Sequence, residues 1–205
     1  FLYFVPSIEG SLTSDESDAP DALRSRIAFR LDGDCCLGLD GMSAYLNLKH
    51  EADQQFNYQD LTAELLFEPI KLRAGIGMYR PLFGNPNNAP LYYRLEPFLG
   101  VDGGRNIERG ASRETERSVL RLLARARALL LVKHFLIARD VVFFLDDMFY
   151  HLPLQRGEDA FNYLVLGAEF PVSDNISFLL TYRVGEASPK FEKIETIGGS
   201  LGFKF

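Results

Sequence analysis

Apolar and polar residues alternate with a period of two along most of this chain. In the last segment Ile197, Gly199, Leu201, Phe203 and Phe205 share one parity, and small or polar residues take the other. The same alternation runs through 23–31, 61–67, 91–102, 163–170 and 176–184. Successive side chains of a β-strand point to opposite faces. The pattern therefore predicts a chain made mostly of strands, each with one apolar and one polar face.

The length of these segments indicates what kind of sheet they form. The predicted strands run for about 9–14 residues, whereas 5–6 is usual in soluble sheets and about 9–11 are needed to cross a bilayer. Strands can span lipid only in a closed barrel, because every backbone group then has a partner. The short turn at 171–175 and the longer connection at 185–193 also suit a barrel. We expect an all-β, antiparallel transmembrane up-and-down β-barrel of ten or twelve strands, occupying residues 1–205 as a single domain.

One stretch supports two interpretations. Arg113, Arg117, Arg121 and Arg125 recur every four residues, which would place them on one face of a helix. Residues 120–132 also alternate between apolar and polar, and the segments on both sides are rich in β-formers. Local helix propensity is the weaker guide, so a strand is favoured, with a helix over Arg113–His134 as the alternative.

Two connections are also predicted. Glu68 and Pro69 are expected to form a turn or a bulge, followed by a strand over Ile70–Met78. Gly103–Glu116 is expected to be the longest and most charged loop.

Composition excludes several classes of protein. The 205 residues include 22 Lys or Arg and 28 Asp or Glu, and the net charge of −6 argues against a nucleic-acid partner. The hydrophobic content of 47% is too high for a disordered chain. No apolar run reaches the ~18 residues of a membrane-spanning helix. The adjacent Cys35 and Cys36 are expected to be small apolar side chains, because a bridge between neighbours on a strand would be strained.

The final strand resembles a known assembly signal. Its alternation ends on Phe205 with Phe203 two positions earlier, which looks like the C-terminal strand of bacterial outer-membrane barrels. Residues 162–205 also resemble the tail of a salt-induced outer-membrane protein family of unknown function. The matching segments are Phe170–Ser177, Leu180–Arg183 and Gly202–Phe205. The resemblance implies a bacterial outer-membrane location. Its partners would be outer-membrane lipid and lipopolysaccharide, and the barrel-assembly machinery would read Phe203 and Phe205.

Catalytic chemistry is not expected. His151 is followed two residues later by Pro153, so it lacks the His-x-Ser arrangement of outer-membrane lipases. It also lacks the Asp-x-His pair of outer-membrane proteases, because Asp147 lies four residues away. His50, His134 and His151 are expected to be rim or loop residues, because a catalytic base needs a positioned nucleophile or water. Three scattered histidines and two adjacent cysteines do not form a metal-ligand pattern. The chain is therefore expected to be no enzyme, with no cofactor and no metal.

Arginines dominate the polar faces of the predicted strands. The candidates for lining the lumen are Arg24, Arg26, Arg30, Arg73 (or Lys71), Arg94, Arg121, Arg125, Arg127 and Arg183, and Glu96, Asp102, Asp146 and Glu169 share that side. These charges either pair in a filled interior or form an electropositive passage for small anionic solutes. A barrel this small has a narrow lumen, which favours a structural or scaffold barrel, able to hold a partner protein, or at most a narrow passage. A soluble β-rich lipid-binding domain is the remaining alternative.

Overall fold

The computed structural model of this chain is a single antiparallel β-sheet. It describes residues 2–10, 22–34, 38–53, 58–85, 88–109, 118–136, 139–154, 159–173, 176–187 and 191–203. The strands are β1 (Leu2–Gly10), β2 (Ala22–Gly33), β3 (Gly41–Asp53), β4 (Tyr58–Ile70), β5 (Arg80–Pro81), β6 (Leu91–Arg109), β7 (Ser118–Leu136), β8 (Arg139–His151), β9 (Ala160–Pro171), β10 (Ile176–Ala187) and β11 (Glu192–Phe203), with one 3-10 turn, η1 (Leu72–Ala74). In the described part of the chain no helix is long and apolar enough to cross a membrane.

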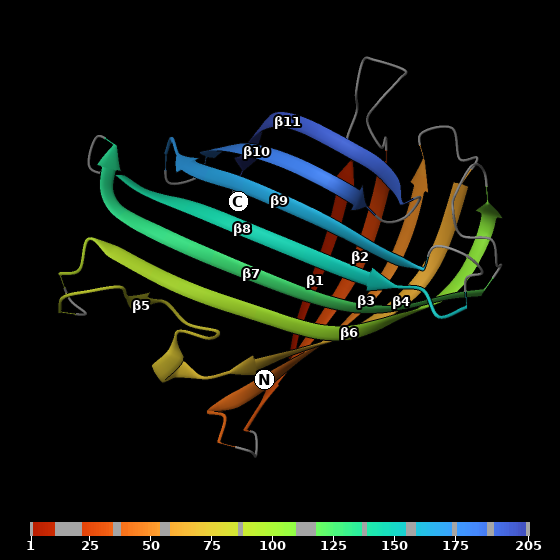
Figure 1. Cartoon of the computed structure of the whole chain (residues 1–205), viewed down its shortest axis with the longest axis horizontal. Coiled ribbons are helices and arrows are strands. Elements are labelled where there is room, and N and C mark those ends of the chain that lie inside the picture. Colours follow the sequence, from red (N-terminus) through yellow and green to blue (C-terminus); the bar gives the residue numbers. More distant parts are fainter. Residues whose placement is uncertain are drawn as a thin grey trace.

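Neighbouring strands in the sequence are neighbours in the sheet. The order is β1-β2-β3-β4-β6-β7-β8-β9-β10-β11, and β5 pairs with β6 outside this path. In the part of the chain that the structure describes, ten strands thus follow the meander, the lower of the two expected numbers. The sheet curls strongly (Figure 1). Among the described residues, β1 pairs only with β2 and β11 only with β10, so the pairing is that of a curved, open sheet.

The two faces of the sheet differ as the alternation predicts. The outer, convex face exposes large apolar side chains, with Leu99 67% and Ile197 79% exposed. Others on this face are Ile27, Leu31, Leu46, Leu48, Leu61, Phe67, Leu122, Leu145, Phe149, Leu166, Phe178, Leu180 and Leu201. The inner face carries buried polar groups such as Asn47, Asp102 and Arg121. This distribution is apolar outward and polar inward.

The contested stretch is a strand where the structure describes it. β7 covers Ser118–Leu136 and pairs with both β6 and β8. Its inward arginines stand opposite carboxylates, with Arg121 paired to Asp102 and Arg127 to Glu96. Opposite charges on paired strands stabilise a sheet, and a helix would have no such partners. The helical alternative is therefore wrong for the described residues, and residues 110–117 lie outside them.

Two predicted connections differ from the structure. β4 runs through Glu68 and Pro69 to Ile70 in unbroken register with β3, so there is neither a turn nor a bulge, and the chain then enters η1 instead of a further strand. Residues Gly103–Arg109 extend β6 and pair with β4, so they are not a loop. The longest connection is the one from β4 to β6, residues 71–90.

The β4–β6 connection fills an open edge of β6. β4 pairs with β6 only from Leu99 onward, which leaves the first part of β6 without that neighbour. The amide of Leu95 donates to the carbonyl of Gly75 at 2.8 Å, and the amide of Gly77 donates to the carbonyl of Leu95 at 2.9 Å. Gly75 and Gly77 have φ values of 71° and 78°, which turn the chain back toward β6 and which L-residues rarely adopt. The connection therefore replaces the missing ladder with this turn at Leu95 and with the short strand β5, which pairs with Tyr92 and Tyr93.

The two ends of the sheet are distinguished by their connections. We call the end with the β2–β3, β4–β6, β7–β8 and β9–β10 connections the turn end, and the opposite end the loop end. The start of β1 and the end of β11 both lie at the turn end.

Candidate functional site: a charged interior

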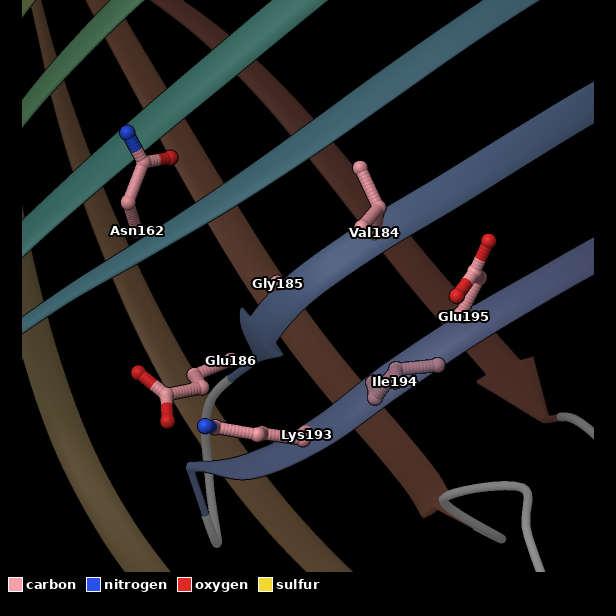
Figure 2. Close-up of a pocket in the computed structure, with 7 residues that line it drawn as sticks. All are labelled: Asn162, Val184, Gly185, Glu186, Lys193, Ile194 and Glu195. Atoms are coloured by element: carbon pink, nitrogen blue, oxygen red, sulfur yellow. The ribbon is translucent and has the colours of Figure 1, made fainter.

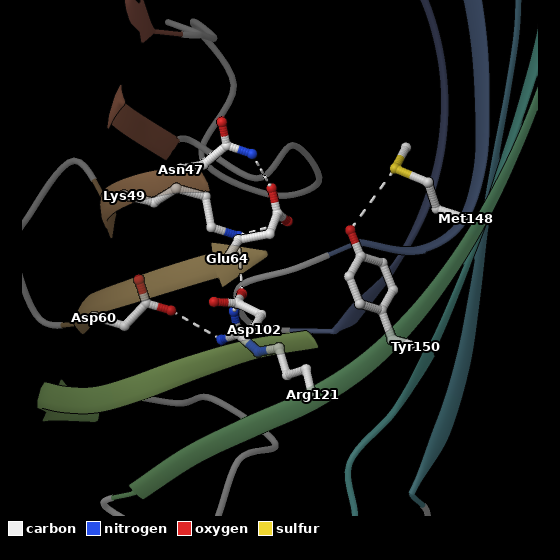
Figure 3. Close-up of polar contacts among 8 residues, drawn as sticks. All are labelled: Asn47, Lys49, Asp60, Glu64, Asp102, Arg121, Met148 and Tyr150. Carbon is white, nitrogen blue, oxygen red and sulfur yellow. Dashed lines mark hydrogen bonds and ion pairs between the residues drawn. The ribbon is translucent and has the colours of Figure 1, made fainter. Parts of the chain in front are cut away.

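A buried ion network joins four strands on the inner face. Arg121 of β7 donates through Nη2 to Asp60 Oδ2 at 2.8 Å and through Nη1 to Asp102 Oδ2 at 3.1 Å. Lys49 Nζ donates to the same Asp102 oxygen at 2.8 Å and to Glu64 Oε2 at 3.1 Å. The side chains of Arg121, Asp60 and Asp102 are 0% exposed. We call these five residues, with Asn47, the Arg121 network (Figure 3).

The network ties β3, β4, β6 and β7 together through side chains. Asn47 Nδ2 of β3 donates to Glu64 Oε1 of β4 at 2.7 Å, which completes the chain from Asn47 to Asp60. Buried charges are tolerated only when they are paired and hydrogen-bonded. Because Asp102 accepts from both Lys49 and Arg121, removing either cation would leave excess negative charge in the interior.

A second group lies nearer the turn end. Arg125 makes a bidentate pair with Asp146, of which the Nε–Oδ1 contact is 2.7 Å. Arg127 lies 3.4 Å from Glu96 and 3.9 Å from Asp146, and Arg94 lies 2.5 Å from Glu96. We call these five residues the three-arginine group. Three cations here share two carboxylates.

Aromatic rings cover several of these guanidinium groups. Arg125 lies 5.7 Å from the ring centroid of Phe98, and Arg127 lies 5.6 Å from that of Phe144. Such contacts favour the charged form of a partly desolvated arginine. They also fill space between the charged groups.

A third group of polar side chains lies on β2, β3 and β4 of the inner face and includes two hydroxyl groups. Arg30 Nε donates to Asp32 Oδ1 at 2.7 Å, and Ser43 Oγ donates to the same oxygen at 2.6 Å. Tyr45 donates its hydroxyl to Glu68 Oε2 at 2.6 Å. Side chains of β2 and β3 thus donate hydrogen bonds to both carboxylates of this group, Asp32 and Glu68.

The loop end of the interior is covered by an aromatic cluster centred on Phe191. Its ring stacks on Phe161 of β9 with centroids 4.5 Å apart and meets Tyr150 of β8 edge-on at 5.5 Å. Phe191 and Leu152 are buried, and Phe191 is 0% exposed. Phe191 has a φ of 54°, a left-handed conformation that is costly for a bulky side chain. We call Phe191, Phe161, Tyr150 and Leu152 the Phe191 cap.

At the other end, Tyr79 of the β4–β6 connection contacts the three-arginine group. Arg94 lies 5.9 Å from its ring centroid. Burial raises the pKa of the Tyr79 hydroxyl, an effect that Arg94 opposes and that Glu96 and Glu169 reinforce. The connection therefore brings a neutral ring to the turn end of the interior.

The inner face as a whole is not electropositive. Its described bases are Arg30, Lys49, Arg94, Arg121, Arg125, Arg127, Lys133 and Arg183, and its described acids are Asp32, Asp60, Glu64, Glu68, Glu96, Asp102, Asp146, Asp140 and Glu169. The bases do not outnumber the acids, and most of the arginines contact a carboxylate.

Most of the predicted lumen residues belong to this interior. Arg30, Arg94, Arg121, Arg125 and Arg127 all contact carboxylates there. Glu169 and the exposed Arg183 take inner-face positions on β9 and β10.

Other predicted residues fall elsewhere. Arg73 was expected to line the lumen, but it is exposed in η1, because the segment after Ile70 turns rather than extends. Lys71, the alternative to Arg73 as a lumen residue, instead donates a hydrogen bond from its ammonium group to the carbonyl of Gly38. For Arg24 and Arg26 the structure describes only strand positions in β2, opposite Glu51 and Lys49.

The remaining predictions concern the chain end and the cysteines. Phe203 ends β11 in register with Ile176. Phe205, Cys35 and Cys36 lie outside the described residues.

The sequence reasoning missed five residues that complete the site. Lys49, Asp60 and Glu64 have the inward parity of their strands, so the alternation alone could have placed them on the inner face. Phe191 and Tyr79 lie in connections, where no periodicity identifies the residues that turn inward.

The histidines are far apart in the sheet. His50 lies on β3, and His134 and His151 lie on β7 and β8 at opposite ends. His151 Nδ1 is 3.7 Å from Asp159 Oδ2, and both side chains are substantially exposed. Within the described ranges, no group of three His, Cys, Asp or Glu residues is placed to hold a metal ion.

Comparison with known proteins returns no matching family model, no similar curated protein and no similar solved structure.

Proposed function

We propose that this protein is a non-enzymatic barrel of the bacterial outer membrane with a structural or scaffold role, whose interior is filled by ion pairs. In this proposal the curved sheet closes by pairing β1 with β11. In an even-numbered antiparallel barrel the first strand begins and the last strand ends at the same end of the barrel. The ten strands here fit that rule, because β1 begins and β11 ends at the turn end.

The outer face supports a membrane environment. Large apolar side chains such as Leu99, Ile197 and Leu201 are 60% or more exposed. A water-soluble protein rarely leaves so extensive an apolar surface uncovered. The acyl chains of a bilayer would cover such a surface, as they cover the outward-facing apolar band of membrane barrels.

The same distribution disfavours a soluble lipid-binding barrel. That class needs an apolar interior for its ligand and a polar exterior for water. Here the fully buried side chains include Arg121, Asp60 and Asp102, while leucines are exposed. The arrangement is the inverse of the one such a domain requires.

The observation that carries the structural role is the pairing of Arg121. Its guanidinium is fully buried between two carboxylates and beneath the ring of Phe191. An anion-selective passage needs uncompensated Arg or Lys around the pore. Since the interior bases are matched by acids, a filled interior is favoured over the alternative of a channel for small anionic solutes.

Two measurements test this proposal. The protein folded in detergent is expected to migrate faster on a gel before boiling than after, and to require detergent for solubility. In planar bilayers it is expected to show no single-channel steps. A monodisperse protein without detergent would remove the membrane location, and a stable anion-selective conductance would replace the structural role by the channel.

Biogenesis provides a separate test. If Phe203 and Phe205 form the assembly signal, deletion of Phe205 should reduce insertion into the outer membrane. Normal insertion of the shortened chain would contradict that role. Cell fractionation of both chains provides the measurement.

A further inference from the structure

The connection from β4 to β6, at the turn end, differs in charge from the rest of the chain. Residues 71–90 include the three bases Lys71, Arg73 and Arg80 and contain no Asp or Glu, whereas the whole chain has a net charge of −6. The side chain of Arg73 is exposed in η1. The connection is therefore a basic segment in an acidic protein.

Apolar side chains of the same connection point outward from the sheet. Arg80 pairs with Tyr93, which has the outward parity of the exposed Leu99 on β6. Paired residues of neighbouring strands point to the same face. Met78 and Leu82 have the parity of Arg80, and they are 54% and 52% exposed. The apolar outer face of the sheet thus continues onto the connection.

The turn η1 is held against this outer face. Figure 1 shows η1 and β5 beside the first part of β6. Arg80 Nε donates to the carbonyl of Leu72 at 2.7 Å. A Cβ atom at Gly75 would lie 2.5 Å from the ring of Tyr93, so glycine allows the chain to pass close to that ring. These contacts fix the position from which Arg73 extends.

The described acids do not neutralise this basic segment. Within the described ranges, no carboxylate forms an ion pair with Lys71, Arg73 or Arg80. Asp40 of the β2–β3 connection contacts the segment through its backbone, because Asp40 Oδ2 accepts from the amide of Leu72 at 2.7 Å. The positive charge of the connection is thus available to an anionic partner.

The outer face at the loop end carries charge of the other sign. There β10 and β11 present Glu186, Lys193 and Glu195 around a polar cavity (Figure 2). Two acids and one base give that surface a net negative charge. An anionic partner would therefore be attracted to the turn end and not to this part of the loop end.

We propose that residues 71–83 bind the anionic phospholipid headgroups of the membrane leaflet at the turn end. This inference rests on the proposed outer-membrane location, in which the turn end faces the periplasm and lies in the phospholipid leaflet. Lys71 and Arg73 would bind phosphate groups, because basic side chains near an anionic bilayer surface are attracted to it. Met78 and Leu82 would contact the acyl chains beside those headgroups.

The direction of the side chains favours lipid over a periplasmic protein as the partner. Met78 and Leu82 point the same way as Leu99, which faces the bilayer in the proposed barrel. A periplasmic protein would approach along the axis of the barrel instead. Tyr93, on the same face, is of a residue type enriched at the membrane–water interface.

The absence of tryptophan from the sequence allows a direct test. Met78→Trp introduces a single indole, whose fluorescence is quenched by bromine atoms on acyl chains that contact it. The protein is folded into vesicles of equal parts phosphatidylglycerol and phosphatidylcholine, with only one of the two lipids brominated. We expect brominated phosphatidylglycerol to quench about threefold more than brominated phosphatidylcholine, because the bases enrich the anionic lipid nearby.

Substitutions of arginine in the Met78→Trp protein test the role of charge. Arg73→Gln should at least halve the preference for phosphatidylglycerol, and Arg73→Lys should retain it. Arg105→Gln is the matched control, because it removes an exposed arginine from β6 toward the loop end, and it should leave the preference unchanged. Heat-modifiable migration of each variant first establishes that it is folded.

Leu99→Trp separates failure of this inference from failure of the proposed function. Quenching of Leu99→Trp without quenching of Met78→Trp would show that the connection does not contact lipid, which leaves that surface to a protein partner and overturns the inference. Equal quenching of Met78→Trp by the two lipids, or no effect of Arg73→Gln, would also overturn it while the membrane location stands. No quenching at either position would overturn the location and, with it, this inference.

Discussion

The ring of Phe191 lies over the guanidinium of Arg121, with 5.5 Å between the ring centroid and Cζ. This contact joins the loop-end cap to the buried ion network, although the two residues are far apart in the sequence. Phe191 adopts a left-handed backbone conformation to place its ring inward, and this conformation costs free energy of folding. The burial of the ring against Phe161 and Tyr150 offsets that cost.

Phe191→Ala should destabilise the protein by about 3–5 kcal/mol, because it removes a fully buried ring and leaves a cavity over Arg121. Urea unfolding of the protein in lipid vesicles provides the measurement. Phe191→Gly is the matched variant. It loses the same ring but accepts a φ of 54°, so it should be more stable than Phe191→Ala by about 1 kcal/mol. The reverse order would contradict the backbone cost inferred at this position.

Arg121→Met should cost about 3–5 kcal/mol, because it leaves the carboxylates of Asp60 and Asp102 buried with less compensation. Adding Asp102→Asn to that variant should recover part of the loss, since one of the stranded charges is then removed. Arg183→Met is the control, because Arg183 is an exposed arginine of the inner face. An equal effect of Arg121→Met and Arg183→Met on the free energy of unfolding would refute a special role for the Arg121 network.

Gly104→Ala should destabilise the pairing of β4 with β6. A Cβ atom at Gly104 would lie 2.1 Å from the carbonyl oxygen of Leu61 and 2.7 Å from the Cα of Thr62, so the backbone itself must shift. We expect a loss of about 1–3 kcal/mol. Gly103→Ala is the neighbouring control, because its Cβ would meet only one atom within 4 Å, at 3.9 Å. It should change stability by less than about 0.5 kcal/mol. Equal unfolding midpoints for the two variants would contradict the close approach.

Combined Glu96→Gln and Asp146→Asn should leave Arg94, Arg125 and Arg127 without their carboxylate partners. The interior would then carry excess positive charge, and any conductance gained should favour anions. The reversal potential across a salt gradient in planar bilayers measures this selectivity. Asp32→Asn, at the separate Arg30 group, should produce no such conductance. Cation selectivity in the doubly substituted protein would contradict the role of these carboxylates in neutralising the arginines.

Alternation predicted most of the strands and the face that most of their side chains take. It placed Arg121, Arg125 and Arg127 on one face of a strand, where the structure also has them. It failed at Arg73, where the sequence still alternates but the backbone turns. Gly75 and Gly77 adopt left-handed conformations there, and the open edge of β6 provides backbone partners for the turn. Those partners belong to a distant strand, so no local pattern reveals them.

The sequence by itself determined the period of two, and with it an all-β chain with one apolar and one polar face. The reason is that side-chain direction in a strand depends only on local backbone geometry. Only the tertiary structure decided which charges pair. Arg121 reaches Asp60, 61 positions earlier in the chain, because β4, β6 and β7 lie side by side in one register. That register decided that most of the inward arginines face carboxylates instead of being left free to attract anions.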